Sequence, residues 1–205
     1  MKPARHISVC SFAMLVVAAL FLAGCAVLFS PIPHPRPYWH AAAGATNQDI
    51  PKIAIIVIDQ SQRLYGQNEA IPREVEDKFI EQLLGKGYRV ADRSDVAQVI
   101  NEIRFQHEGL TEADAAKLGK MLNVPAVLVV TIEGINVSLS STAINGLTIY
   151  NIRTSVSARL IDVESAEVLG LTSFTDTYQA NDQNDLSSVV FVAEAVADVV
   201  PAQSN

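Results

Sequence analysis

The residues Lys52–Asp59 form an almost continuous apolar run, KIAIIVID. An apolar run of this length is too short for a separate helix and is typical of a strand that is buried on both faces. Such a strand needs helices on each side of its sheet. The segment therefore predicts that the chain folds as a sheet covered by helices.

Helix and strand signals alternate after this run. Pro72 is predicted to open a helix at its preferred first position, and apolar residues then recur at helical spacing until Gly85. Residues 88–91 are typical of a second buried strand. Two further helices are predicted after the polar residues 92–95 and after Thr111, whose spacing to Asp114 matches a capping box.

The second half of the chain has the pattern of an antiparallel meander. A strand is predicted from residue 126 to about 140, a second over 147–163 and a third over 168–178. Asn145 and Gly146 predict the type I′ turn between the first two, because both residues tolerate the positive φ that this turn requires. A last helix is predicted from Leu186 to Val200.

These patterns predict an α/β (α+β) fold. Its mixed sheet has parallel strands from the N-terminal half and an antiparallel C-terminal meander, with helices packed on it. The hairpin around Asn145 and Gly146 is the predicted contact or membrane-insertion element.

The N-terminus has the layout of a secretory signal. Lys2 and Arg5 precede an apolar stretch that ends in Leu22-Ala23-Gly24-Cys25, a motif that resembles the bacterial lipobox. We therefore expect residues 1–24 to be a lipoprotein signal peptide and Cys25 to carry a covalent lipid, which is the only cofactor expected. The alternative is an uncleaved membrane anchor, because the apolar character continues beyond Cys25.

Residues 25–50 are predicted to be a tether between this anchor and a domain at residues 51–205. Four prolines at alternate positions favour an extended polyproline conformation. Tyr38 and Trp39 follow these prolines. They are expected either to contact a membrane or partner or, more commonly, to pack on the domain.

The amino-acid composition argues against nucleic-acid binding, metal binding and catalysis. The net charge of −7 disfavours nucleic acid, and the two cysteines lie in the N-terminal segment, so that disulfide and zinc sites are not expected. His107 is the only histidine in the predicted domain. We expect no metal, no small-molecule substrate and no enzyme activity. Four other polar residues are read as turn, ion-pair or isolated groups: Asp59, Arg93, Glu133 and Glu194.

Several short motifs resemble the CsgG-type curli-secretion lipoprotein family. They are residues 88–95 (YRVADRSD), 109–111 (GLT), 116–120 (AKLGK) and 158–163 (ARLIDV), within a similarity that extends from about Lys52 to Tyr178. The resemblance implies an anticodon-binding-domain-like fold and a lipidated N-terminus on the outer membrane, with the domain facing the periplasm. It also implies a role in secretion or envelope assembly through contacts with envelope proteins or by self-association.

Two alternatives remain open within this resemblance. The first is an oligomeric outer-membrane secretion pore of the curli type, in which each subunit gives two hairpins. Residues 134–153 have the length of one such hairpin, whereas residues 179–185 are too few for the second. The second alternative is a periplasmic accessory lipoprotein that activates or docks a partner enzyme.

Overall fold

The computed structural model describes residues 35–43, 50–61, 70–103, 110–142, 148–185 and 187–203. The chain divides into two units, Met1–Pro35 and Arg36–Asn205. The second unit contains every described helix and strand.

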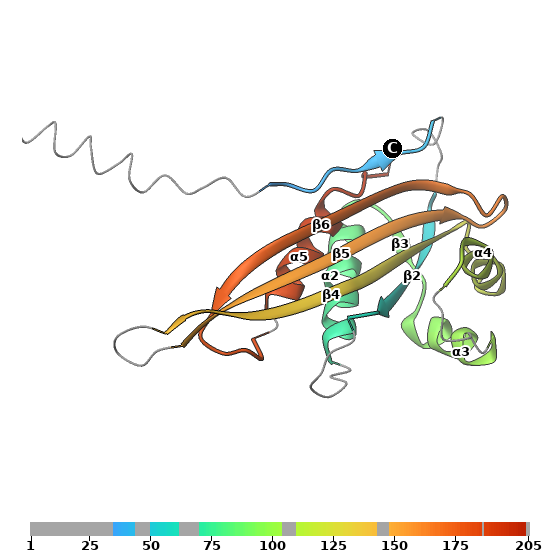
Figure 1. The fold of residues 1–205 in the computed structure, drawn as a ribbon. Helices are drawn as coiled ribbons and strands as arrows, with labels where there is room; N and C mark the ends of the chain where they lie inside the picture. The colour runs from blue at the N-terminus through green and yellow to red at the C-terminus, as the bar shows by residue number, and fades with distance from the viewer. Residues whose placement is uncertain are drawn as a thin grey trace, which may run out of the picture. The chain divides into compact units, whose positions relative to one another are not determined.

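A six-stranded mixed sheet forms the centre of this unit (Figure 1). The strand order is β1-β6-β5-β4-β2-β3. β2 is parallel to β3 and β4, whereas β4, β5, β6 and β1 are antiparallel neighbours. The predicted fold class is therefore confirmed. The strands are β1 (His40–Ala41), β2 (Lys52–Asp59), β3 (Arg89–Val90), β4 (Ala126–Thr142), β5 (Thr148–Asp162) and β6 (Val168–Ala180).

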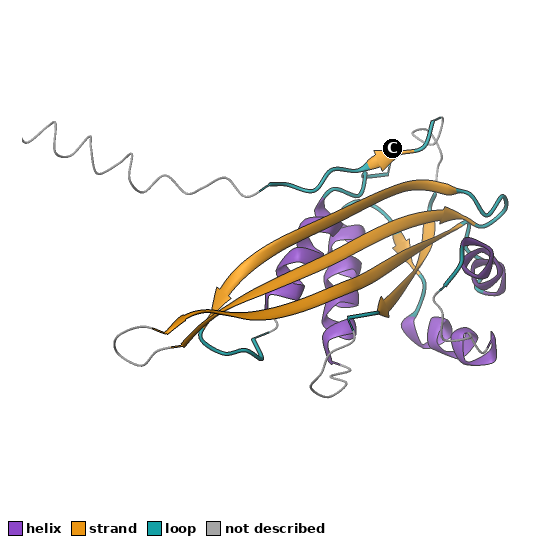
Figure 2. Cartoon of the chain, in the orientation of Figure 1, coloured by secondary structure: helices purple, strands orange, loops and turns teal. Residues whose placement is uncertain are grey.

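The described helices cover the sheet from both sides (Figure 2). α2 (Ala70–Gly85) and α5 (Ser187–Asp198) share one hydrophobic cluster with the sheet, and α3 (Arg93–Ile103) and α4 (Glu112–Met121) share a second cluster. β2 contributes to both clusters, because Ile53 and Ile55 face the first while Ala54 and Ile56 face the second. The prediction of a strand buried on both faces is confirmed.

Local signals placed the helix ends to within a few residues. α2 begins at Ala70, so that Pro72 is its third residue rather than the predicted first. Thr111 and Asp114 form the predicted capping box of α4, in which each side chain bonds to the other residue's backbone N–H. The second strand is shorter and less buried than predicted. Only Arg89–Val90 pair with β2, and Arg89 is exposed, because β3 lies at the sheet edge with a partner strand on one side.

The sheet also has one strand that the sequence analysis did not predict. His40–Ala41 pair with Leu171 and Gly170 of β6, within the segment assigned to the tether. Trp39 packs against the hydrophobic core beside this pairing, which favours the domain-packing interpretation for that residue, while Tyr38 stays exposed. A carbon added at Gly170 would lie 2.5 Å from the Trp39 ring, so that the glycine makes room for the indole.

Candidate protein-contact site

The predicted site residues Cys25, Asn145 and Gly146 lie outside the described residues, and so does His107. The two arms of the predicted hairpin are described as far as Thr142 and Thr148, which pair with each other. In Figure 1 these arms and the end of β6 extend beyond α2 and α5. We call this part of the sheet, residues 133–142, 148–155 and 173–180, the distal meander.

The two faces of the distal meander differ in chemistry. Ile135, Val137 and Leu139 alternate along β4 with the polar residues Asn136 and Ser138. The apolar face extends across β5 and β6, because Val137, Ile152 and Tyr178 lie opposite one another in one cross-strand row. The opposite face carries a row of hydroxyl, amide and guanidinium groups: Asn136, Ser138, Asn151, Arg153, Ser155, Thr175, Thr177 and Gln179.

Part of the apolar face remains open to solvent. Leu139 is 64% exposed and Val137 is 44% exposed, although both lie in regular strand. On the same face, the Tyr178 ring of β6 contacts Phe191 of α5 edge-on, with 5.2 Å between ring centroids, and Phe191 is 53% exposed. Burial of the Tyr178 hydroxyl and the nearby Asp176 carboxylate raise the pKa of this phenol above its usual range.

An acidic groove borders Phe191. It lies between α2 and α5 and has a volume of about 540 Å³. Val190 and Phe191 supply its apolar part, and most of its charged groups are carboxylates. The lining residues are Glu74, Asp77, Lys78, Ser187, Val190, Phe191 and Glu194.

The structure changes the interpretation of two polar residues. Glu194, read from the sequence as an isolated carboxylate, shares the acidic groove with Glu74 and Asp77. Arg93 pairs with Glu76 at 2.7 Å and also with Asp77, so that its partners come from α2 rather than from the aspartates beside it in sequence. Neither the carboxylate group of the groove nor the ion pairs of Arg93 could be predicted from the sequence. Their members are far apart in the chain and meet only when α2 packs beside α5 and α3.

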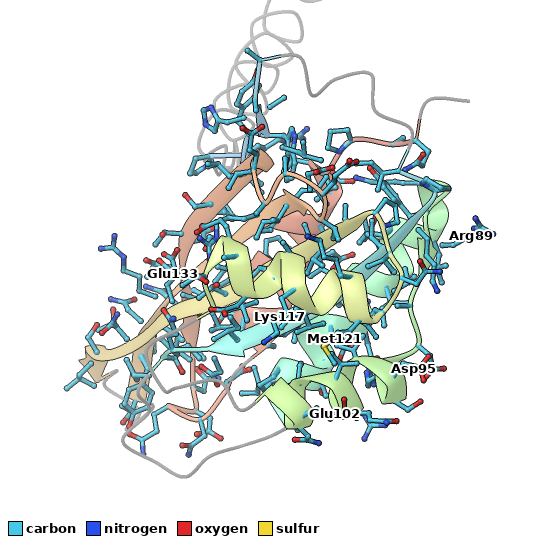
Figure 3. The ribbon with its side chains drawn as sticks, turned by 90° about the vertical axis from the view of Figure 1, so that its right-hand side faces the viewer. Arg89, Asp95, Glu102, Lys117, Met121 and Glu133 are labelled. Atoms are coloured by element: carbon cyan, nitrogen blue, oxygen red, sulfur yellow. The ribbon has the colours of Figure 1, made fainter. Side chains whose placement is uncertain are left out.

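The two remaining candidate residues, Asp59 and Glu133, are not part of a common site. The Asp59 carboxylate accepts a hydrogen bond from the Ser61 backbone N–H at 3.0 Å, which is the predicted turn role. Glu133 is exposed on β4. Figure 3 shows Glu133 well apart from Asp95, Glu102 and Lys117 on the α3 and α4 side, with no common point toward which these side chains converge.

No group of three or more His, Cys, Asp or Glu side chains in the described ranges is arranged to hold a metal ion. No helix in the same ranges is both long enough and apolar enough to cross a membrane.

Comparison with known proteins gives structural neighbours only. No family model matches the chain, and no curated protein matches it. Lipoprotein GNA1162 from Neisseria meningitidis is 17% identical, with a TM-score of 0.49 over 65% of this chain and 87% of that one. The PelC dodecamer from Paraburkholderia phytofirmans is 15% identical, with a TM-score of 0.49 over 82% and 99%. The LpoB C-terminal domain from Escherichia coli is 11% identical, with a TM-score of 0.40 over 67% and 87%.

Proposed function

We propose that this chain is a lipid-anchored protein of the cell envelope that acts by binding other proteins. The observation that carries the proposal is a set of exposed apolar side chains, Val137 and Leu139 on the apolar face of the distal meander and Phe191 at the acidic groove. Exposed apolar side chains bordered by charges are typical of protein-contact surfaces. The carboxylates of the groove favour a partner segment that presents basic residues around an apolar one.

The anchor is proposed from the sequence. A lipid on Cys25 would hold the chain at the membrane, and Ala26 in the following position favours the outer membrane. At about 3 Å per residue, the proline segment would keep the domain roughly 30 Å from that surface. The motifs at residues 88–95 and 116–120 support a CsgG-like domain with a role in secretion or envelope assembly, by contact rather than by catalysis.

Photo-crosslinking tests the contact surface. A photoreactive amino acid at Leu139 is expected to capture a partner protein in the native envelope. The same group at Ser138, the adjacent exposed residue on the opposite face, is the matched control and is expected to give much less product. Equal capture at both positions would remove the apolar face from the proposal.

Charge reversal tests the groove separately. Glu74→Lys with Glu194→Lys is expected to reduce the Leu139 adduct, because the surface would then repel a basic partner. Glu102→Lys on α3 is the control, since α3 packs on the other face of the sheet. An unchanged adduct in the double variant would show that the groove does not contribute.

The anchor has its own test. Intact mass and membrane fractionation of the wild type against Cys25→Ala are expected to show an acyl mass gain and membrane retention that the variant loses. A wild-type chain without acyl mass that is still retained would show an ordinary anchor instead.

A secretion pore is the second candidate, favoured by the alternation of apolar and polar residues along β4. In a pore, a cysteine at Leu139 would be protected from a water-soluble maleimide in membranes but not in detergent, while a cysteine at Ser138 would react in both. Equal reactivity of Leu139→Cys in membranes and in detergent would exclude insertion of this hairpin.

A further inference from the structure

A second groove lies between β2, α2 and α3, away from the distal meander. It has a volume of about 440 Å³, within the range of roughly 300–1,000 Å³ that is typical of ligand sites. Ile55 and Ile56 both line it, although their side chains face different hydrophobic clusters on opposite faces of the sheet. A groove that contacts both of these neighbours must run along the edge of the strand. We call it the β2-edge groove.

β2 has an open edge at this groove because β3 is short. β3 pairs only with Lys52 and Ile53, whereas β2 continues to Asp59. The ladder ends where the Ala91 N–H donates to the Ile53 carbonyl at 2.8 Å, and the chain then enters α3. No described strand pairs with the rest of this edge.

Two hydrogen bonds identify the backbone groups that face the groove. The Ala91 N–H bonds to the carbonyl of the odd-numbered Ile53, whereas the N–H of the even-numbered Gln60 donates to a β4 carbonyl at 2.9 Å. Backbone groups alternate in direction along a strand, so that odd-numbered residues of β2 face the β3 side. Ile55 and Val57 therefore direct their N–H and carbonyl groups into the groove, where no described backbone group bonds to them.

A helix borders the groove on each face of the sheet. α2 supplies Pro72, Arg73 and Glu76, and α3 supplies Val96 and Ile100. α2 packs on one face of the sheet and α3 on the other (Figure 2). The groove is therefore the place in the sheet that a longer β3 would occupy. One extended chain added there would have a helix on each side, as β2 itself has.

The charged groups of the groove favour an acidic occupant. Arg93 also lines it but is already engaged, because its guanidinium pairs with Glu76 at 2.7 Å and with Asp77. Arg73 is exposed and forms no ion pair with another residue in the described ranges. Its guanidinium is therefore available to a carboxylate, in a chain whose net charge is −7.

An extended peptide matches these features better than other ligands do. An acyl chain has no group that could bond to the backbone of Ile55 and Val57, and a small anion would use Arg73 alone. A peptide supplies backbone donors and acceptors as a further strand. Its successive side chains point to opposite faces. A carboxylate directed toward Arg73 on α2 would therefore have neighbours directed toward the apolar Val96 and Ile100 on α3.

We propose that the β2-edge groove binds an extended segment of a partner protein, which adds a short strand to β2. The segment has an acidic residue between two apolar residues. Its carboxylate pairs with Arg73, and its backbone exchanges hydrogen bonds with Ile55 and Val57. This second contact site goes beyond the proposed function, because it takes an acidic rather than a basic segment and depends neither on the distal meander nor on the lipid anchor.

A peptide selection with a strand-blocking variant tests the site. Val57→Pro removes an N–H that the β4 ladder does not use, so that the fold is expected to tolerate it. A displayed library of random short peptides is first depleted on Val57→Pro and then selected on the wild-type full chain in detergent. We expect peptides with an acidic residue between two apolar ones, which also bind Val57→Ala. Recovery of no such peptide, with unchanged circular dichroism of the variant, would overturn the proposal.

Charge reversal tests the role of Arg73. Arg73→Glu is expected to weaken binding of a selected peptide about tenfold or more, measured by fluorescence anisotropy. Lys117→Glu on α4 makes the same change in net charge outside the groove and is the control, expected to bind within about twofold of the wild type. Equal losses in the two variants would overturn direct pairing with Arg73.

Hydrogen exchange measured by NMR examines the strand edge itself. In the free chain, the amides of Ile55 and Val57 are expected to exchange about tenfold or more faster than those of Ile56 and Ile58, which face β4. A selected peptide is expected to slow the first pair only. Slow exchange of Ile55 and Val57 without peptide would overturn the open edge. The Leu139 crosslink is read separately, so that failure of either site is distinguishable from failure of the other.

Discussion

Lys86 joins two parts of the folded unit that are far apart in the sequence. It follows α2, and its ammonium donates to the carbonyl oxygens of Ala197, Asp198 and Val200 at the end of α5. Burial lowers the pKa of this ammonium, yet its position at a helix C-terminus suits a positive charge. The ammonium adds a charged donor where the last carbonyls of a helix have few backbone partners; the Ala197 carbonyl also accepts from the Val200 N–H at 3.3 Å.

Lys86→Met tests this cap. It nearly keeps the length of the side chain but removes the ammonium from all three carbonyls, and we expect a loss of about 2 kcal/mol in the free energy of unfolding. That loss corresponds to a Tm lower by about 6 °C. Lys117→Met on the exposed face of α4 is the control, expected within about 1 °C of the wild type. Equal Tm values for the two variants would contradict the cap.

Gly119 is required by close packing rather than by backbone conformation. A carbon added there would lie 2.2 Å from the Val163 Cγ2 and 2.9 Å from the Val127 Cγ2, so that α4 could not keep its distance from the sheet. This gives a physical reason for the glycine in the AKLGK segment. The same argument does not hold for Gly85, where an added carbon would meet nothing within 4 Å.

Gly119→Ala and Gly85→Ala are therefore a matched pair. Overpacking at Gly119 costs about 1–3 kcal/mol, which outweighs the gain of at most about 1 kcal/mol from the better helix former. At Gly85 only the gain remains. Urea unfolding is expected to place the midpoint of Gly119→Ala below the wild type and that of Gly85→Ala at or above it. A stabilised Gly119→Ala would show that α4 can move away from the sheet.

Among the helices and strands, the features that could be predicted from the sequence are those determined by residues close together in the chain. The capping box of Thr111 and Asp114 and the alternation along β4 each depend on residues close in sequence. β1 depends instead on Gly170, far along the chain, because the glycine makes room for Trp39. The acidic groove likewise required the packing of α2 beside α5. The spacing of residues in the sequence does not indicate that β1 pairs with β6 or that α2 packs beside α5.

The attachment of β1 can be followed with Trp39, the only tryptophan of the chain. Gly170→Ala places a methyl group where the indole lies, and we expect the ring to leave the core and its fluorescence to shift to longer wavelength. Gly134→Ala on β4 is the control, since its added carbon has only the Asn136 amide at 3.6 Å. Unchanged emission from Gly170→Ala would show that Trp39 packs by another route.

In the folded unit as a whole, helices cover the sheet unequally, and the proposed contact surface lies where they leave it exposed. Among the described residues, β2 and the first half of β4 have helices on both faces, whereas the distal meander has a helix, α5, on one face. Its other face is polar, so that the meander can remain exposed without a second helical layer. The apolar residues that remain open, Val137 and Leu139, lie farther along β4 than the residues that pack on the core.

Acid is expected to destabilise the whole unit through two helix starts. The Asp92 carboxylate accepts from the Ser94 N–H at 2.8 Å, and the Asp185 carboxylate accepts from the Ser187 N–H at 3.0 Å. Hydrogen bonds from these serines, through hydroxyl and backbone, lower the pKa of both carboxyl groups. A carboxyl whose pKa is lower in the folded state stabilises the protein above its unfolded pKa of about 4.

This stabilisation is lost as the pH falls from about 4 through the lower pKa of the folded state. We therefore expect the Tm to be nearly constant between pH 7 and pH 5 and to fall steeply below pH 4. Asp92→Asn with Asp185→Asn keeps an acceptor oxygen at both helix starts but removes the titration. The fall in Tm between pH 7 and pH 3 should shrink by several degrees in this double variant. Scanning calorimetry at the two pH values measures it, and an undiminished fall would mean that other carboxylates control the acid response.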